Sequence, residues 1–159
     1  MEGFKRFIEI CDKGKHALSA DEAIFSSNQF NQKTWYPQNA KCLIKKKKIG
    51  FKAIAVVAAV DRAGKVVALH MRERSIDSDG FVVFLRKVGV AMKRRKCYML
   101  VDNLITHRTD AVREQARKSN IELIFNGTYS SDYNAIERLW SFSKHRFYKT
   151  CIDEAQYHL

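Results

Sequence analysis

Proline and glycine are both scarce in this 159-residue sequence, which contains one proline, Pro37, and seven glycines. No segment is rich enough in these residues to act as a linker between domains, and no internal repeat is present. These absences argue against a string of domains or a repeat protein. A chain of this length suits one domain with a substantial core.

Cysteine is also scarce, with four residues at positions 11, 42, 97 and 151. No two are close enough in sequence to form a zinc knuckle or a redox pair, and Cys97 lies in an apolar stretch typical of a small core residue. No apolar run approaches the length of a membrane span, and no secretory signal begins the chain. We therefore expect an intracellular protein without a membrane partner, in the cytoplasm or nucleoid, or in the nucleus if the host is eukaryotic.

Acidic residues are few, because 17 Asp and Glu oppose 29 Lys and Arg for a formal net charge of +12. Such a surplus favours a polyanionic partner, although a solubilising surface or a ribosome-like basic protein also explains it. The densest cluster, Lys45–Lys48, is typical of a solvated loop and is equally available to a nucleic acid. The residues predicted to contact DNA are Lys45, Lys46, Lys47, Lys48, Arg94 and Arg95.

Hydrophobic periodicity predicts alternating strands and helices. The predicted helices cover residues 2–11, from 78 or 79 to about 92, from 106 or 109 to 119, and from about 133 to 148. The predicted strands cover residues 16–25, 51–60, 65–71, 97–101 and 121–125, with a hairpin turn at 61–64. This order predicts an α/β fold with a mixed five-stranded sheet, an antiparallel hairpin and helices on both faces.

Asp102 directly follows the short apolar segment Cys97–Val101, which is typical of a central parallel strand. Ligands bind at the carboxyl edge of such strands in open α/β sheets. A turn or helix-capping aspartate is the alternative, since Asn103 follows and a helix begins soon afterwards. Taken alone, Asp102 therefore leaves both interpretations open.

Glu137 lies on the last predicted helix, at the flank of an apolar stripe. A carboxylate at that flank can face the sheet edge while the stripe packs on the sheet. The alternative is a surface glutamate paired along the helix or forming a capping box with Asn134. The stripe consists of Ile136, Trp140, Ser143 and Phe147.

Asp21 is a third candidate acid, because strand alternation places it on the opposite face from Glu22. If its strand neighbours that of Asp102, the two carboxylates lie on strands about 4.8 Å apart. Carboxylates gathered in this way can bind a hard divalent metal ion. Asp61 is a weaker competitor because the predicted hairpin turn explains it.

Two segments resemble the DDE transposases of the mariner-like superfamily, in particular their bacterial insertion-sequence branch. The first is Val101-Asp102-Asn103 followed by His107, which matches a D-N-x-x-x-H block. The second runs from Tyr129 to Trp140 and on to Lys144, which resembles the family's S-P-D-x-N-P-I-E-x-x-W-x-x-x-K except at its two prolines. Asp102 and Glu137 are 137 − 102 = 35 positions apart, so 34 residues lie between them, and this spacing also matches the family. Weaker likenesses to the family's first-acid block and first helix occur at residues 19–23, 35–37 and 81–85, so the resemblance covers about residues 15–150.

The resemblance implies an RNase H-like fold and a transposase catalytic domain that cleaves phosphodiester bonds at transposon ends and joins them to target DNA. Asp21, Asp102 and Glu137 would be both catalytic residues and ligands of two Mg²⁺ or Mn²⁺ ions. We also expect a homodimer in the active assembly. Residues that would support the acids or position DNA are Asn103, His107, Asn134 and Lys144, with a solvated helix lysine as the alternative for Lys144.

The sequence also departs from the family pattern. Ser131 and Ala135 stand where the family often has proline, which loosens the entry to the last helix. Only about 15 residues precede the first-acid strand, too few for the usual helix-turn-helix module, so we expect a single catalytic domain over residues 1–159. The rival hypotheses are an inactive or domesticated DNA-binding remnant of a transposase, and a nuclease for RNA–DNA hybrids, against which the Asn134–Trp140 motif argues.

Overall fold

The computed structural model describes residues 2–26, 53–126 and 136–157, the stretch 151–157 by its backbone alone. The elements in chain order are α1 (Glu2–Asp12), β1 (Ala17–Phe25), β2 (Ile54–Asp61), β3 (Val66–Glu73), α2 (Ser78–Ala91), β4 (Cys97–Val101), the 3-10 turn η2 (Ile105–Arg108), α3 (Asp110–Lys118), β5 (Ile121–Phe125) and α4 (Ile136–Tyr157). The predictions for residues 35–37, Lys45–Lys48, Ser131, Asn134 and Ala135 lie outside the described residues.

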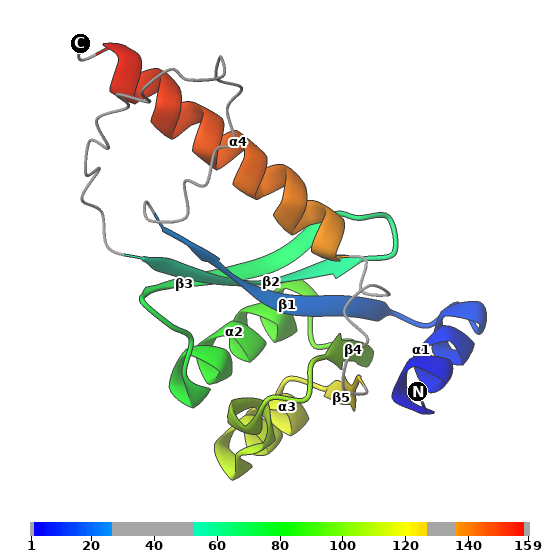
Figure 1. The fold of residues 1–159 in the computed structure, drawn as a ribbon. Helices are drawn as coiled ribbons and strands as arrows, with labels where there is room; N and C mark the ends of the chain where they lie inside the picture. The colour runs from blue at the N-terminus through cyan, green and yellow to red at the C-terminus, as the bar shows by residue number, and fades with distance from the viewer. Residues whose placement is uncertain (1, 27–52, 127–135, 158–159) are drawn as a thin grey trace.

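The strands form one mixed sheet in the order β3-β2-β1-β4-β5 (Figure 1). β2 pairs antiparallel with both β1 and β3, whereas β4 pairs parallel with both β1 and β5. The predicted five-stranded sheet with an antiparallel hairpin is therefore confirmed. The interior parallel position predicted for Cys97–Val101 is confirmed as well, because β4 has a strand on each side.

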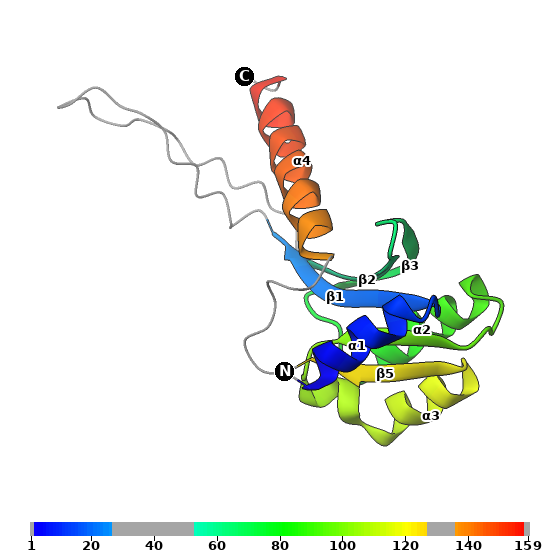
Figure 2. The same ribbon diagram turned by 90° about the vertical axis from the view of Figure 1, so that its right-hand side faces the viewer.

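Helices cover both faces of the sheet, as predicted (Figures 1 and 2). α2 and α3 lie on one face, where their apolar side chains pack against Leu18, Met99 and Ile121 of three strands. On the other face, α1 packs over β4 and β5, and α4 packs over β1 and β2. Alternation along the strands explains the division, because Leu18 and Ala17 of β1 contact opposite layers.

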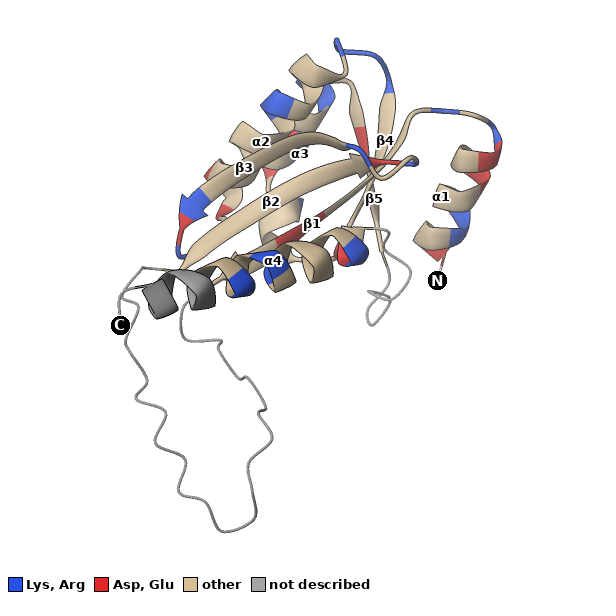
Figure 3. Cartoon of the chain, turned by 90° about the horizontal axis from the view of Figure 1, so that it is seen from above, with Lys and Arg blue, Asp and Glu red and all other residues tan. Residues whose placement is uncertain are grey.

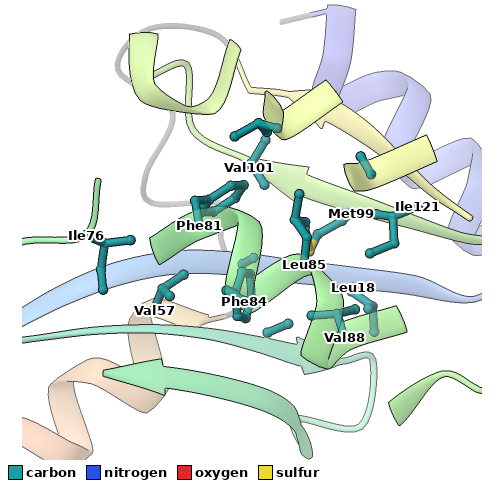
Figure 4. Close-up of a cluster of buried hydrophobic side chains, with 14 of the residues drawn as sticks. Leu18, Val57, Ile76, Phe81, Phe84, Leu85, Val88, Met99, Val101 and Ile121 are labelled. Carbon is teal, nitrogen blue, oxygen red and sulfur yellow. The ribbon is translucent and has the colours of Figure 1, made fainter. Parts of the chain in front are cut away.

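The larger core lies between the sheet and α2 (Figure 4). α2 contributes Phe81, Phe84, Leu85 and Val88, each at most 1% exposed. Burying side chains of this size stabilises a fold by about 1.5–3 kcal/mol each. This core fixes β1 against β4, and these two strands carry the candidate acids Asp21 and Asp102 to one edge of the sheet.

Some predicted boundaries were wrong. α2 is capped by Asp77 instead of Ser78 or Asp79, because the Asp77 carboxylate accepts a hydrogen bond from the Gly80 N–H at 2.8 Å. α4 continues to Tyr157 instead of ending near Tyr148, since residues 149–157 contain neither proline nor glycine to stop a helix. Of the two predicted starts of the next helix, Thr109 is confirmed as the N-cap of α3, whereas Thr106 lies in the separate 3-10 turn η2.

The turn interpretation of Asp61 is confirmed. Its carboxylate accepts hydrogen bonds from the backbone N–H groups of Ala63 and Lys65, both at 2.9 Å. Gly64 takes φ +78°, which a glycine adopts without strain, and this closes the hairpin between β2 and β3. Asp61 therefore serves the turn.

Among the described residues, no helix combines the length and the hydropathy that crossing a bilayer requires.

Candidate active site

The register between β1 and β4 brings Asp21 and Asp102 together. The last paired positions of these parallel strands are Ser19 and Leu100. Two residues further along each strand stand the two acids, since 19 + 2 = 21 and 100 + 2 = 102. Both therefore lie just beyond the last paired positions of β1 and β4, and Asp102 stands at the carboxyl end of β4, where open α/β folds bind their ligands. The condition that the strand of Asp21 neighbours that of Asp102 is therefore met.

Asp21 lies on the face of the sheet that α4 covers. Its Oδ2 accepts a hydrogen bond from the indole N–H of Trp140 at 3.2 Å. The pKa of Asp21 is raised to about 6. Burial is the main cause and the negative charges of Glu137 and Asp102 add to it, while hydrogen bonds from the Glu22 backbone and Trp140 act in the opposite direction. Asp21 therefore carries a negative charge that its own surroundings disfavour.

Glu137 occupies the first turn of α4 and is exposed. Ile136 and Trp140 beside it are buried against Ala23 and Phe25 of β1 and other residues of this layer. The helix is thereby anchored so that Glu137 lies within electrostatic reach of Asp21. The apolar stripe packs on the sheet and leaves the glutamate at its flank, as the periodicity predicted.

A second set of contacts surrounds Asp102 on the opposite face. His107 of η2 is 2% exposed, and its Nδ1 lies 2.7 Å from Asp102 Oδ1. Its Nε2 donates to Glu22 Oε1 at 3.1 Å. The contact between His107 Nδ1 and Asp102 Oδ1 does not have the geometry of a hydrogen bond, so it is described as an ion pair. The imidazole thus bridges two carboxylates from different strands.

Protonation of His107 follows from this bridge. Burial alone would lower the pKa of His107, but its contacts with Asp102 and Glu22 and their negative charges raise it to about 9. The ring also stacks on Phe81, with centroids 4.0 Å apart and an interplanar angle of 27°. At neutral pH, a buried imidazolium therefore holds the Glu22 and Asp102 carboxylates.

The chemistry of the three predicted acids fits a hard divalent cation, because carboxylate oxygens are the ligands that Mg²⁺ and Mn²⁺ prefer. Burial raises the pKa of Asp21 most, and the negative charges of Glu137 and Asp102 add to the rise; a bound cation would relieve that repulsion. As placed, no group of three or more His, Cys, Asp or Glu side chains in the described parts of the chain is tight enough to hold a metal ion. Binding would require side-chain movement, which the exposed Glu137 permits.

The remaining predicted site residues are spread over the molecule. Asn103 is exposed directly after Asp102, and Lys144 is partly exposed seven residues after Glu137, on the same side of α4. Arg94 and Arg95 lie in the turn before β4, at the opposite edge of the sheet from Asp102. They therefore do not share a surface with the three acids, and their contact with DNA stays a prediction.

Sequence reasoning missed two contacts, one between Glu22 and His107 and one between Asp21 and Trp140. Alternation predicts that Glu22 points away from Asp21, and its hydrogen bond to His107 confirms this orientation. Trp140 was assigned to the apolar stripe without its hydrogen bond to Asp21. No local pattern links these pairs, since Glu22 and His107 are 85 positions apart and Asp21 and Trp140 are 119 apart.

Residues 16–156 match the family model described as DDE superfamily endonuclease. The match spans most of the chain, and this protein belongs to that family. No curated protein matches the sequence.

Several solved structures share the fold. The Mos1 mariner paired end complex with Mn superposes with a TM-score of 0.69 at 16% identity over 96% of this chain and 52% of that one. The Mos1 transposase catalytic domain with Raltegravir and Mg gives 0.64 at 16% identity, covering 96% and 77%. A simian T-cell lymphotropic virus intasome bound to PP2A regulatory subunit B56 gamma gives 0.63 at 16% identity, covering 87% and 42%. The fold is therefore RNase H-like, as the resemblance implied.

The chain spans about half the length of the Mos1 complexes that it matches, with 51% of one and 52% of another covered. Structures of Mos1 with Mn and with Mg are consistent with the use of divalent metals by this family.

Proposed function

We propose that this chain is the catalytic domain of a divalent-metal-dependent DNA transposase, in which Asp21, Asp102 and Glu137 are the acidic ligands of two Mg²⁺ or Mn²⁺ ions. The observation that carries the proposal is the convergence of three acids, on β1, directly after β4 and on α4. The pKa of Asp21 is raised to about 6 mainly by burial, and the charges of Glu137 and Asp102 contribute to the rise. Membership of the DDE superfamily endonuclease family supports the same assignment.

Bound metal would supply Lewis-acid activation of the attacking oxygen and neutralise charge on the phosphate during phosphodiester cleavage and strand transfer. The chain itself contributes the placement of the acids. Trp140 orients Asp21 through its indole N–H, and the anchored first turn of α4 carries Glu137 to the same edge. Asn103, His107, Asn134 and Lys144 are proposed to support the acids or to position DNA.

The expected polymer partner is DNA, both transposon ends and target. A net charge of +12 attracts a polyanion without reading its sequence. α4, whose first turn contains Glu137, also carries basic side chains, among them Arg138 and Lys144 (Figure 3). Lys45–Lys48, Arg94 and Arg95 are proposed as further phosphate contacts, and the active assembly is proposed to be a homodimer.

Mn²⁺-dependent nicking of supercoiled plasmid tests the function. Wild type should convert the plasmid to the open circle, and Asp102→Ala should lose this activity. Asp110→Asn is the matched control, because Asp110 lies in α3 with a side chain 98% exposed. The three proteins should bind plasmid equally at the same salt concentration.

Two results would contradict the assignment. Equal nicking by wild type and Asp102→Ala would remove the acids from the reaction. DNA binding by wild type without any nicking would favour the rival hypothesis of an inactive or domesticated remnant. An RNA–DNA hybrid offered in parallel should be cut more slowly than DNA, and preferential cleavage of the hybrid would instead support an RNase H-type nuclease.

A further inference from the structure

His107 is a buried side chain whose two ring nitrogens face carboxylates from two different parts of the chain. Its side chain is 3% exposed, compared with 43% for Asp102 and 22% for Glu22. Burying an imidazolium is costly unless both ring nitrogens are paired. Here both are paired, because Nδ1 faces Asp102 Oδ1 and Nε2 faces Glu22 Oε1.

Three elements fix the ring in place. Phe81 of α2 stacks on one side of it at a centroid distance of 4.0 Å, and Phe81 itself is 1% exposed in the main core. Glu22 of β1 holds Nε2, and the backbone N–H of His107 donates to the Leu104 carbonyl at 3.1 Å within η2. A ring held by packing and by hydrogen bonds presents Nδ1 to Asp102 from one direction.

We propose that His107, held by Glu22 and Phe81, is a positioning residue that fixes the Asp102 carboxylate for metal binding. The contact is made to Oδ1 of Asp102. Residues that orient the side chains of metal ligands typically change metal affinity by about 10–100-fold when removed. The inference rests on the proposed function, in which Asp102 is a ligand.

Glu22 has a defined part in this arrangement. An imidazolium alone beside Asp102 would compete with a metal cation for the same carboxylate. The charge of Glu22 compensates that of the ring, so the Glu22–His107 pair is neutral as a unit and acts on Asp102 through geometry. Asp21 and Glu22, adjacent on β1, therefore serve the same edge of the sheet from opposite faces.

A charge-neutral double variant isolates the geometric effect. Glu22→Gln with His107→Leu removes one negative and one positive charge and takes away the donor that faces Asp102. Glu22→Gln with His107→Asn has the same charge, but the new side-chain amide places a donor near the former position of Nδ1. His70→Leu is the control, since His70 is a partly exposed residue of β3.

Mn²⁺ binding by isothermal titration calorimetry is the primary readout, with thermal unfolding of every variant beside it. The Glu22→Gln/His107→Leu variant is expected to raise the Mn²⁺ dissociation constant about tenfold or more, and the Glu22→Gln/His107→Asn variant to recover most of the loss. His70→Leu should match wild type. The Mn²⁺ concentration for half-maximal nicking should rise in parallel, while the rate at saturating Mn²⁺ changes less.

Other outcomes overturn the proposal. A merely structural role would reduce the number of binding sites through lost folded protein and leave the dissociation constant unchanged. Wild-type affinity in the Glu22→Gln/His107→Leu variant would exclude positioning while leaving the proposed function intact, provided that Asp102→Asn abolishes binding. No Mn²⁺ binding by wild type would refute the proposed function itself. If that double variant fails to fold, Glu22→Gln alone decides, because the uncompensated imidazolium should weaken Mn²⁺ binding and wild-type affinity would contradict the role of Glu22.

Discussion

Asp21 and Glu22 are adjacent carboxylates on one strand, yet the two faces of the sheet treat them differently. On the α4 face, Asp21 meets the neutral donor Trp140 and the negative charges of Glu137 and Asp102. On the α2 face, Glu22 meets the imidazolium of His107. One acid is therefore surrounded by like charge, and the other already has its cation.

The difference separates two uses of a partly buried acid. A carboxylate with a built-in cation is a structural partner, because its charge is already compensated within the fold. A carboxylate beside two further acids is destabilising until a cation arrives, which is typical of a site prepared for a metal ion. Strand alternation alone assigns these two roles to neighbouring residues.

The largest predicted effect contrasts the two acids directly. Asp21→Asn should reduce Mn²⁺-dependent nicking by about 1,000-fold, equivalent to about 4 kcal/mol of transition-state stabilisation, since it removes a ligand. Glu22→Gln should cost only about tenfold, because it acts through His107. Initial rates on supercoiled plasmid at several Mn²⁺ concentrations measure both. A larger loss in Glu22→Gln than in Asp21→Asn would reverse the assignment.

The next effect concerns the stability of the α2 face. The pKa of His107 lies at about 9 in the folded chain against an ordinary value of 6.5. A raised histidine pKa stabilises the fold fully below pH 6.5 and ceases to do so as pH rises through 9. Wild type should thus lose about 2–3 kcal/mol of unfolding free energy over this window.

Urea unfolding at a series of pH values measures this slope, the fall of the unfolding free energy as pH rises from 6.5 to 9. The Glu22→Gln/His107→Leu variant should lack it, whereas His70→Leu should keep it. An unchanged slope in the double variant would mean that other groups titrate in this window and that the bridge contributes little.

Much of this comparison follows from sequence, because alternation in residues 17–25 already placed Asp21 and Glu22 on opposite faces. The sequence predicts β4 and β5 with their observed bounds, since each is a short, mainly apolar segment ended by a polar residue. The proximity of Asp21 to Asp102 was conditional on which strands pair, and that pairing depends on packing against α2.

The partners of the two acids were beyond sequence reasoning. The partners in each hydrogen bond are 85 positions apart for Glu22 and His107 and 119 apart for Asp21 and Trp140, so no local sequence pattern reveals them. The sequence places His107 only in the D-N-x-x-x-H block and Trp140 only in the apolar stripe of the last helix. The Asp77 cap was missed because Ser78 and Asp79 are equally good capping residues one and two positions later. Backbone geometry, which a single sequence does not specify, decides among such neighbours.

A smaller effect tests whether Asp21 is a destabilising residue without metal. Its pKa, raised from 3.8 to about 6, means that the negative charge costs stability above pH 6 and that the cost disappears towards pH 4. Asp21→Asn should therefore raise the unfolding free energy at pH 7.5 by about 1–2 kcal/mol, after allowance for partial exposure.

Thermal unfolding in EDTA and in Mn²⁺ checks this point. Mn²⁺ should stabilise wild type and leave Asp21→Asn unchanged, since only the native site with all three acids binds the ion. A metal-free Asp21→Asn protein less stable than wild type would show that Asp21 is a structural acid like Glu22.

The smallest effect concerns the donor on the α4 face. In the structure, the rings of Trp140 and Phe25 lie 6.3 Å apart, centroid to centroid. Trp140→Phe keeps an aromatic ring against Phe25 but removes the indole N–H that bonds to Asp21. The backbone N–H of Glu22 still bonds to Asp21, so the Mn²⁺ concentration for half-maximal nicking should rise only about two- to threefold.

Phe147→Leu is the matched control, because Phe147 packs on the same Phe25 at 5.3 Å and lies about 10 Å further along α4. Both variants should lose about 1 kcal/mol of stability, but only Trp140→Phe should change the Mn²⁺ requirement. Equal shifts in the two variants would mean that the packing of α4, and not the hydrogen bond, places Asp21.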